Sequence, residues 1–238
     1  MPHLSILLSR ASILLLLPCV AAFSVQRAAL LETIAPLNRG FSMSNDQKKA
    51  VTAAIDALAA AAPQADVPDL TGDWELIYTD APDILGLDAQ AGPFATCTRI
   101  GQQIDEAAGT ISNVIEYGPR EWASSLVGQA KGDLLQQRVV TSFIKRGTKV
   151  DLKIKGLKVV PKQFFGVSLE SVPPLKLEGF VEPPFGSFEV LYCEPALALA
   201  DGEEVQADSS PIRVIKTING YYSVNRRVGS IGECWGDA

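Results

Sequence analysis

The sequence has almost no histidine: His3 is the one such residue among 238. His3 lies in an N-terminal stretch that has the features of a removable leader, so the mature chain is expected to contain no imidazole. Without imidazole, Ser/His/Asp and Cys/His nucleophile systems, histidine-ligated metals and histidine proton shuttles are excluded. The sequence also contains no phosphate-binding glycine loop and no dinucleotide fingerprint. We therefore expect a protein that is not an enzyme and that needs no cofactor and no metal.

Long apolar runs are also absent. The run from Ile13 to Leu17 follows Arg10 and precedes small residues at Ala21 and Ala22, the pattern of a signal peptide over residues 1–22. It is far shorter than the roughly 20 residues that span a bilayer. Residues 23–29 then contain an arginine but no acid, as transit segments do. A signal peptide followed by phenylalanine resembles the two-part plastid leader of algae with secondary plastids, so the predicted location is the plastid (chloroplast), with secretion as the alternative.

Cysteine is scarce and its spacing is not that of a disulfide scaffold. Loss of Cys19 with the leader leaves Cys97, Cys193 and Cys234, an odd number without a CxxC motif. The net charge is −6, which argues against nucleic acid as a partner. One basic stretch stands out, because residues 145–162 hold seven Lys or Arg side chains and a single acid.

Helical periodicity occupies the first part of the mature chain and predicts two N-terminal helices over residues 30–62. Apolar residues recur at helical spacing from Leu30 to Leu37, and Ser44 with Gln47 forms a candidate capping box before the second helix. These helices are predicted to form a clasp that packs on a larger unit.

From residue 70 onward the apolar period changes from 3.6 to 2, which predicts β-strands separated by Gly, Pro or Asn turns. Eight or nine such strands without an intervening helical pattern favour an antiparallel barrel or sandwich over residues 66–228, followed by a tail over 229–238. A barrel of about eight strands is wide enough to hold one small ligand. The ligand-binding candidates of the barrel interior are Trp74, Leu76, Tyr78, Leu152, Ile154, Leu177, Phe188, Val190, Tyr192 and Tyr222; most residues of this kind also serve as core in any β domain.

Gly72-Asp73-Trp74 at the head of the first strand is the most suggestive local motif. In lipocalin-like barrels a Gly-x-Trp at this place closes the floor, with the indole beneath an arginine of the last strands. Arg213 and Arg226 are the candidate partners here, together with Arg227.

Three stretches read together resemble the plastid lipid-associated protein (fibrillin) family. They are residues 30–40 with 70–79, residues 99–105 with 113–117, and residues 212–215 with 219–226. The sequence departs from the family at Lys216-Thr217, where Arg-Gly is common, and at Ser209-Ser210-Pro211, which replaces an acid pair. The resemblance implies a lipocalin-like barrel that binds apolar isoprenoid or acyl lipids and associates with thylakoid or plastoglobule surfaces. The alternative is a scaffold that recruits a lipid-synthesis enzyme without carrying a ligand.

Two features are candidates for peripheral contact with a membrane or lipid droplet. Lys149, Lys153 and Lys155 would share one strand face, where they could meet anionic headgroups or be solvated like other surface charges. Phe164 and Phe165 lie next to them and form either an apolar loop tip or a buried plug.

Overall fold

The computed structural model describes residues 24–61, 69–124, 134–164, 167–169, 171–178, 186–195 and 210–236. The expected signal peptide over 1–22 lies outside these residues, as do Phe165 and residues 62–68 between the helices and the first strand. A helix over 24–34 begins inside the stretch expected to be transit-like.

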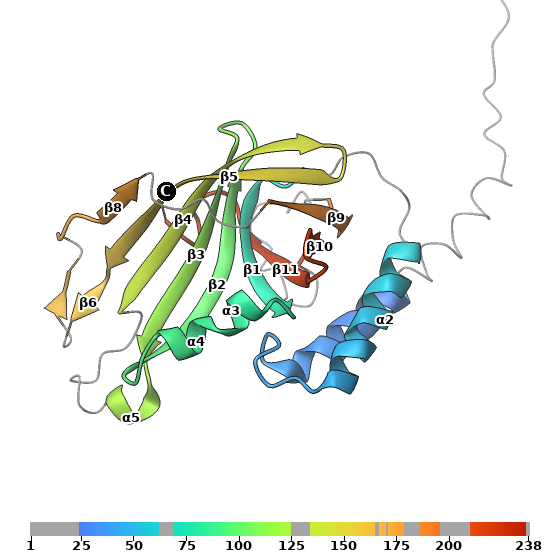
Figure 1. Ribbon diagram of the computed structural model, residues 1–238, viewed down its shortest axis with the longest axis horizontal. Coiled ribbons are helices and arrows are strands. Elements are labelled where there is room, and N and C mark those ends of the chain that lie inside the picture. The colour runs from blue at the N-terminus through green and yellow to red at the C-terminus, as the bar shows by residue number, and fades with distance from the viewer. Residues whose placement is uncertain are drawn as a thin grey trace, which may run out of the picture.

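Two N-terminal helices and a β-barrel make up the described chain, as the sequence predicts (Figure 1). After the helix over 24–34, the helical elements are η1 (Ala35–Leu37), α2 (Asn45–Ala61), α3 (Pro82–Leu85), α4 (Leu87–Gln90) and α5 (Glu121–Ser124). The strands are β1 (Gly72–Thr79), β2 (Ala95–Asp105), β3 (Thr110–Pro119), β4 (Leu135–Arg146), β5 (Lys149–Pro161), β6 (Gln163–Phe164), β7 (Val167–Ser168), β8 (Leu175–Glu178), β9 (Ser187–Cys193), β10 (Ile212–Thr217) and β11 (Tyr222–Gly229).

Eight of these strands close into an antiparallel barrel in the order β4-β3-β2-β1-β11-β10-β9-β5, and β4 pairs with β5 to complete the ring. The short strand β8 continues the sheet outside the ring by pairing with β5. The closure is uneven, since β5 pairs with β4 along almost its whole length but with β9 only from Lys149 to Asp151. Beyond Asp151, the Leu152 N–H still donates to the Gly186 carbonyl at 3.1 Å, and from Gly156 to Val159 the same edge of β5 pairs with β8 instead of β9.

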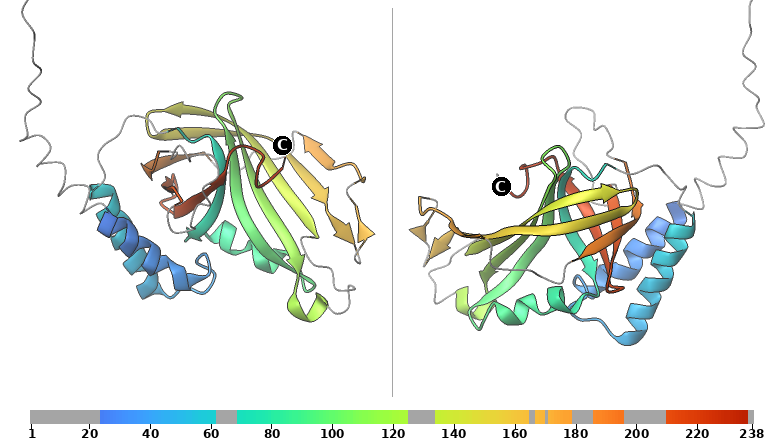
Figure 2. Two further views of the ribbon diagram at one scale, coloured as in Figure 1. Left: turned by 180° about the vertical axis from the view of Figure 1, so that it is seen from behind. Right: turned by 45° about the horizontal axis from the view of Figure 1, so that its top comes forward.

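The helix pair packs against the outside of the barrel over β1, β9, β10 and β11 (Figures 1 and 2). The predicted capping box begins α2, where Ser44 N–H donates to the Gln47 side chain at 2.9 Å and Gln47 N–H donates to Ser44 Oγ at 3.3 Å. Glu194 ties the first helix to the barrel because its carboxylate accepts bonds from Arg27 Nε and the Ile212 N–H, each at 2.7 Å. The predicted clasp is thus anchored by both apolar packing and a partly buried ion pair.

The interior candidates Tyr78, Tyr192 and Tyr222 do not lie in the barrel, so this expectation is wrong. Strict alternation would point Tyr78 and Tyr192 inward, whereas Tyr222 faces outward by its alternation with inward Asn225. All three side chains pack on the outer face with the N-terminal helices. The register of β1 with β11 shifts between Leu76 and Tyr78, and that of β9 with β10 shifts beside Leu191. Each shift is a β-bulge, which inverts the side of every residue after it.

The C-terminal tail is another departure from a simple terminal segment, since residues 230–236 cross the outer face of β1 to β4 (Figure 2). Trp235 is 1% exposed and its ring lies over Gly101. Asp73 accepts hydrogen bonds from the backbone N–H groups of Cys234 and Trp235 at 2.9 and 3.1 Å. The tail is therefore part of the packed structure.

Two apolar clusters occupy the barrel. One surrounds Trp74 at the end where β1 begins and consists of Leu70, Trp74, Ile104, Ile111, Val150, Phe188, Val190 and Ile215. The other lies toward the opposite end and consists of Leu76, Cys97, Ile100, Ile115 and Tyr117. Ile84 of α3 and Leu87 of α4 pack against this second cluster, so these helices lie across that end of the barrel (Figure 1).

Candidate functional site

The Gly-x-Trp motif lies at the closed end of the barrel. Trp74 is fully buried and its indole N–H donates to the Leu70 carbonyl at 2.8 Å. Arg213 stacks on the ring with its guanidinium carbon 4.6 Å from the centroid, and Arg227 lies at 5.9 Å. Gly72 has φ +133°, and a Cβ there would meet the Arg227 side chain at 3.0 Å, so the position requires glycine.

Arg226 does not take part in this stack. Its guanidinium lies on the outer face and pairs with Glu75 at 2.6 Å. Because neighbouring residues of a strand point to opposite faces, Arg227 and not Arg226 reaches Trp74.

A layer of polar side chains crosses the barrel next to Trp74. Arg213 Nη2 donates to Gln102 Oε1, and Gln102 Nε2 donates to Asn113 Oδ1 at 2.8 Å. Asn225 completes the layer, since it is the cross-strand partner of Arg213 between β10 and β11. These four residues come from four strands and lie between the two apolar clusters.

Charge in this layer is unbalanced. Arg213 is 0% exposed, and among the described residues its Nε and Nη1 atoms have no hydrogen-bond partner; the same is true of Asn225 Nδ2. Burial lowers the pKa of Arg213 to about 10, so the guanidinium still carries its charge at neutral pH. The titratable group that acts on it is the thiol of Cys193, whose pKa burial raises to about 11, leaving it neutral.

The inner wall formed by β4 and β5 is less tightly packed than the wall around Trp74. Register with buried Ile111 and Phe188 places Thr141, Phe143 and Val150 on the inner face, and further along it come Val139, Leu152, Ile154, Leu157 and Val159. Leu152 and Ile154 are half-buried although they face inward, whereas Ile104 and Ile111 on the opposite wall are 0% exposed. The half-buried stretch begins where β5 separates from β9.

Apolar side chains are exposed around the end of the barrel where β3 and β5 finish. Phe94 and Trp122 are 57% and 54% exposed, and their rings lie 5.4 Å apart. Leu177, expected in the interior, is instead 44% exposed on β8 outside the ring, beside Leu175. We call Phe94, Trp122, Leu175 and Leu177 the apolar rim.

The membrane-contact candidates are only partly described. Lys149, Lys153 and Lys155 are all exposed along β5, with a register shift at Lys155. The side chain of Phe164 and the whole of Phe165 lie outside the described residues.

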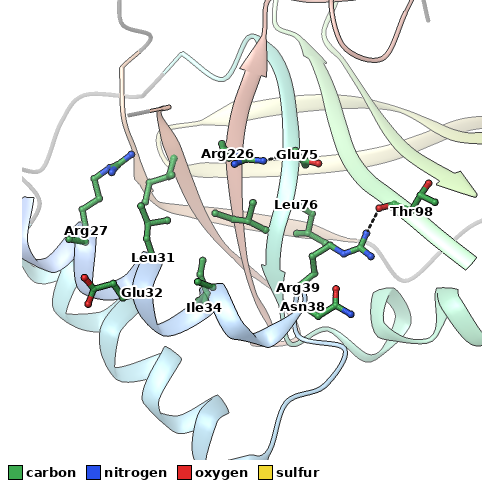
Figure 3. A pocket seen from close by; sticks show the side chains of 14 residues that line it. Arg27, Leu31, Glu32, Ile34, Asn38, Arg39, Glu75, Leu76, Thr98 and Arg226 are labelled. Atoms are coloured by element: carbon green, nitrogen blue, oxygen red, sulfur yellow. Dashed lines mark hydrogen bonds and ion pairs between the residues drawn. The ribbon is translucent and has the colours of Figure 1, made fainter. Parts of the chain in front are cut away.

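A cavity of about 760 Å³ lies outside the barrel, between the helix over 24–34 and strands β1 and β11 (Figure 3). Apolar side chains including Leu31, Ile34 and Ile77 line it, and Arg39 reaches across it to donate to the Thr98 carbonyl at 2.9 Å. Glu75 and Arg226 on its far wall neutralise each other. We call this cavity the flank pocket.

Within the described ranges, no group of three or more His, Cys, Asp or Glu side chains is placed to hold a metal ion. None of the described helices is long and apolar enough to cross a bilayer.

Sequence reasoning missed three of the four polar-layer residues, namely Gln102, Asn113 and Asn225. For Gln102 and Asn113 the signal is visible in the sequence, because each is an amide at an inward position of a strand whose other inward residues are mostly apolar. Asn225 has no such signal, since its inward neighbours on β11 are Ser223 and Arg227. An uncharged polar residue at such a position needs a partner inside the barrel.

Comparison with known proteins agrees with this architecture. No curated protein and no solved structure shows significant similarity to the chain. The family model PAP_fibrillin matches residues 25–206, which cover the first helix and most of the barrel. The chain therefore belongs to the PAP_fibrillin family, the plastid lipid-associated proteins, which are a non-enzymatic family.

Proposed function

We propose that this protein binds an apolar isoprenoid or acyl lipid inside the barrel and associates peripherally with thylakoid or plastoglobule surfaces in the plastid. Family membership supports the plastid setting and a non-catalytic role. The barrel holds the lipid without chemical change.

One observation carries the proposal: the inner wall of β4 and β5 is apolar and half-buried inside a closed barrel. Leu157 and Val159, which are half-buried on this wall, would be fully buried if side chains from the opposite wall filled the interior as they do around Trp74. A lipid chain lying along β4 and β5 would cover these side chains.

Burial of the chain would supply the affinity. Each buried methylene contributes about 0.8 kcal/mol, so ten of them contribute roughly 8 kcal/mol before the cost of ordering the chain. That amount corresponds to a dissociation constant of about 1 μM. The apolar rim and the exposed lysines of β5 supply the two components of peripheral attachment, insertion and attraction to anionic headgroups.

The experiment is extraction and mass spectrometry of lipid bound to purified protein, with a variant that fills the interior. Leu157→Trp adds bulk to the inner wall, whereas Ile144→Trp adds the same bulk on β4 at a side chain that is 59% exposed. We expect bound lipid in the wild type and in Ile144→Trp, and less than half as much in Leu157→Trp. Equal amounts in the two variants would refute binding along this wall.

The scaffold function remains the second candidate, with a lipid-synthesis enzyme as its partner. It predicts no co-purifying lipid and a partner that is retained from plastid membranes after Lys153→Glu and Lys155→Glu. The exposed position of both lysines makes the double substitution a surface change that leaves the barrel intact.

A further inference from the structure

The polar layer contains an excess of hydrogen-bond donors. Within the described part of the chain, three buried nitrogen atoms, Arg213 Nε, Arg213 Nη1 and Asn225 Nδ2, have no hydrogen-bond partner, and their residues face each other across the β10–β11 pair. Gln102 Oε1 accepts from Arg213 Nη2 and Asn113 Oδ1 accepts from Gln102 Nε2, and neither oxygen is bonded to these three nitrogens.

The same layer has an excess of positive charge. Among the described residues, no carboxylate forms an ion pair with Arg213, and Arg227 brings a second guanidinium to the same indole ring. An unpaired buried charge costs several kcal/mol, and a buried donor left without a partner costs more than the bond it could make. Stacking on Trp74 offsets only part of this cost.

The layer also adjoins the half-buried part of the interior. Gln102 and Asn113 are themselves half-buried, and Val139 of the loosely packed wall is the register partner of Asn113. A ligand lying against β4 and β5 would therefore end beside Gln102, one side chain from Arg213.

We infer that Arg213 and Asn225 form an interior site for the carboxylate group of an acyl chain. The carboxylate accepts from the unpartnered nitrogens and balances the guanidinium charge, while the chain extends along β4 and β5 toward the apolar rim. Arg213 is then a ligand-binding residue as well as the stacking partner of Trp74. This inference rests on the proposed lipid-binding function and adds the headgroup class and its recognition site.

The test compares ligand-free protein titrated with sodium dodecanoate and with 1-dodecanol, using calorimetry. The two probes share a chain length and differ in the headgroup. Wild type is expected to bind dodecanoate at least tenfold more tightly than dodecanol, because bonds to a charged group are stronger than neutral ones. Acetate alone is expected not to bind, since it lacks the chain.

Arg213→Met removes the charge and keeps an apolar side chain of similar length. We expect this variant to bind both probes equally and with the affinity of wild type for dodecanol. Lys216→Met is the matched control, because it removes a charge from the outer face of the same strand, and its preference for dodecanoate should be unchanged. Asn225→Leu leaves the Arg213 stack in place and is expected to lower the preference severalfold, which keeps the test valid if Arg213→Met does not fold.

A second readout separates recognition from a purely structural role. Ligand-free Arg213→Met is expected to unfold at a temperature equal to or above that of wild type, because it removes an uncompensated buried charge. A large loss of stability in Arg213→Met, combined with an unchanged preference for dodecanoate over dodecanol in Asn225→Leu, would overturn the inference. A wild-type protein that binds both probes equally would also overturn it. Failure of wild type to bind either probe would instead contradict the lipid-binding function itself.

Discussion

Substitution of Trp235 is predicted to destabilise the barrel although this residue lies four positions from the C-terminus. Its ring is 1% exposed, stacks beneath the Arg99 guanidinium at 4.3 Å and covers Gly101 on β2. The Trp235 carbonyl accepts bonds from Arg138 and Gln136, both buried on the outer face of β4.

The magnitude follows from the area that is lost. A buried tryptophan removes about 150–250 Å² from water, worth about 4–6 kcal/mol at ~25 cal/mol per Å², and measured Trp→Ala costs are about 3–5 kcal/mol. For a domain of this size each kcal/mol corresponds to about 2–4 °C, so Trp235→Ala should lower Tm by roughly 10 °C.

Gly101→Ala tests the same contact from the other side. A Cβ at this position would overlap both the Trp235 ring and the Trp74 carbonyl oxygen, so the tail is expected to detach. Gly186→Ala is the control, because a Cβ there would have no atom within 4 Å and its backbone is not left-handed. Thermal and urea denaturation measure all three variants. The reasoning would be refuted if Trp235→Ala cost less than about 1 kcal/mol, or if Gly101→Ala matched Gly186→Ala.

Three further predictions concern the anchor of the helices, the thiols and the rim. Glu194→Ala should cost about 2–3 kcal/mol in denaturation, because it removes the acceptor of Arg27 Nε, of the Tyr192 hydroxyl and of the Ile212 N–H; no loss would show that these bonds do not stabilise the clasp. Burial raises the pKa of the Cys97 and Cys193 thiols to about 11. Alkylation of these thiols by iodoacetamide at pH 8 should therefore be slow in the native protein and fast in urea, as measured by mass spectrometry of peptides. Equal rates in the two conditions would contradict the burial of the thiols. Changing Phe94 and Trp122 to Ser should reduce flotation with lipid vesicles severalfold, whereas Ile144→Ser should not, and equal flotation would remove the rim from the contact surface.

The strand pattern is the part of the fold that the sequence predicts best. Period-2 alternation places the strands within a few residues of their observed bounds, and the change from period 3.6 near residue 70 separates the helices from the barrel. Both signals depend on which side chains face water, which local sequence encodes.

The features that the sequence does not predict, namely the outward tyrosines and the packed tail, have a different physical origin. A single extra residue at Ile77 or Leu191 inverts the face of Tyr78 or Tyr192, and nothing in the local composition marks either bulge. The tail shows no periodicity, because one ring over one glycine holds it in place. Contacts of this kind depend on segments that are more than a hundred residues apart.

The polar layer is predictable from the sequence only in part. Trp74 and Arg213 are identifiable from the motif that they resemble, while Gln102 and Asn225 become meaningful only when four strands bring them to one level of the barrel. The sequence could therefore suggest that the interior holds a ligand, but not where its polar end would lie.

The central claim is that the lipid lies inside the barrel rather than in the flank pocket. Photolysis of the full-length protein with a dodecanoate that carries a diazirine near its methyl end, followed by peptide mapping, tests this directly. Labelling of the inner faces of β4 and β5 toward the apolar rim, at residues such as Leu135 and Val159, is the predicted result. Labelling of Leu31 and Ile77 in the flank pocket would contradict the account.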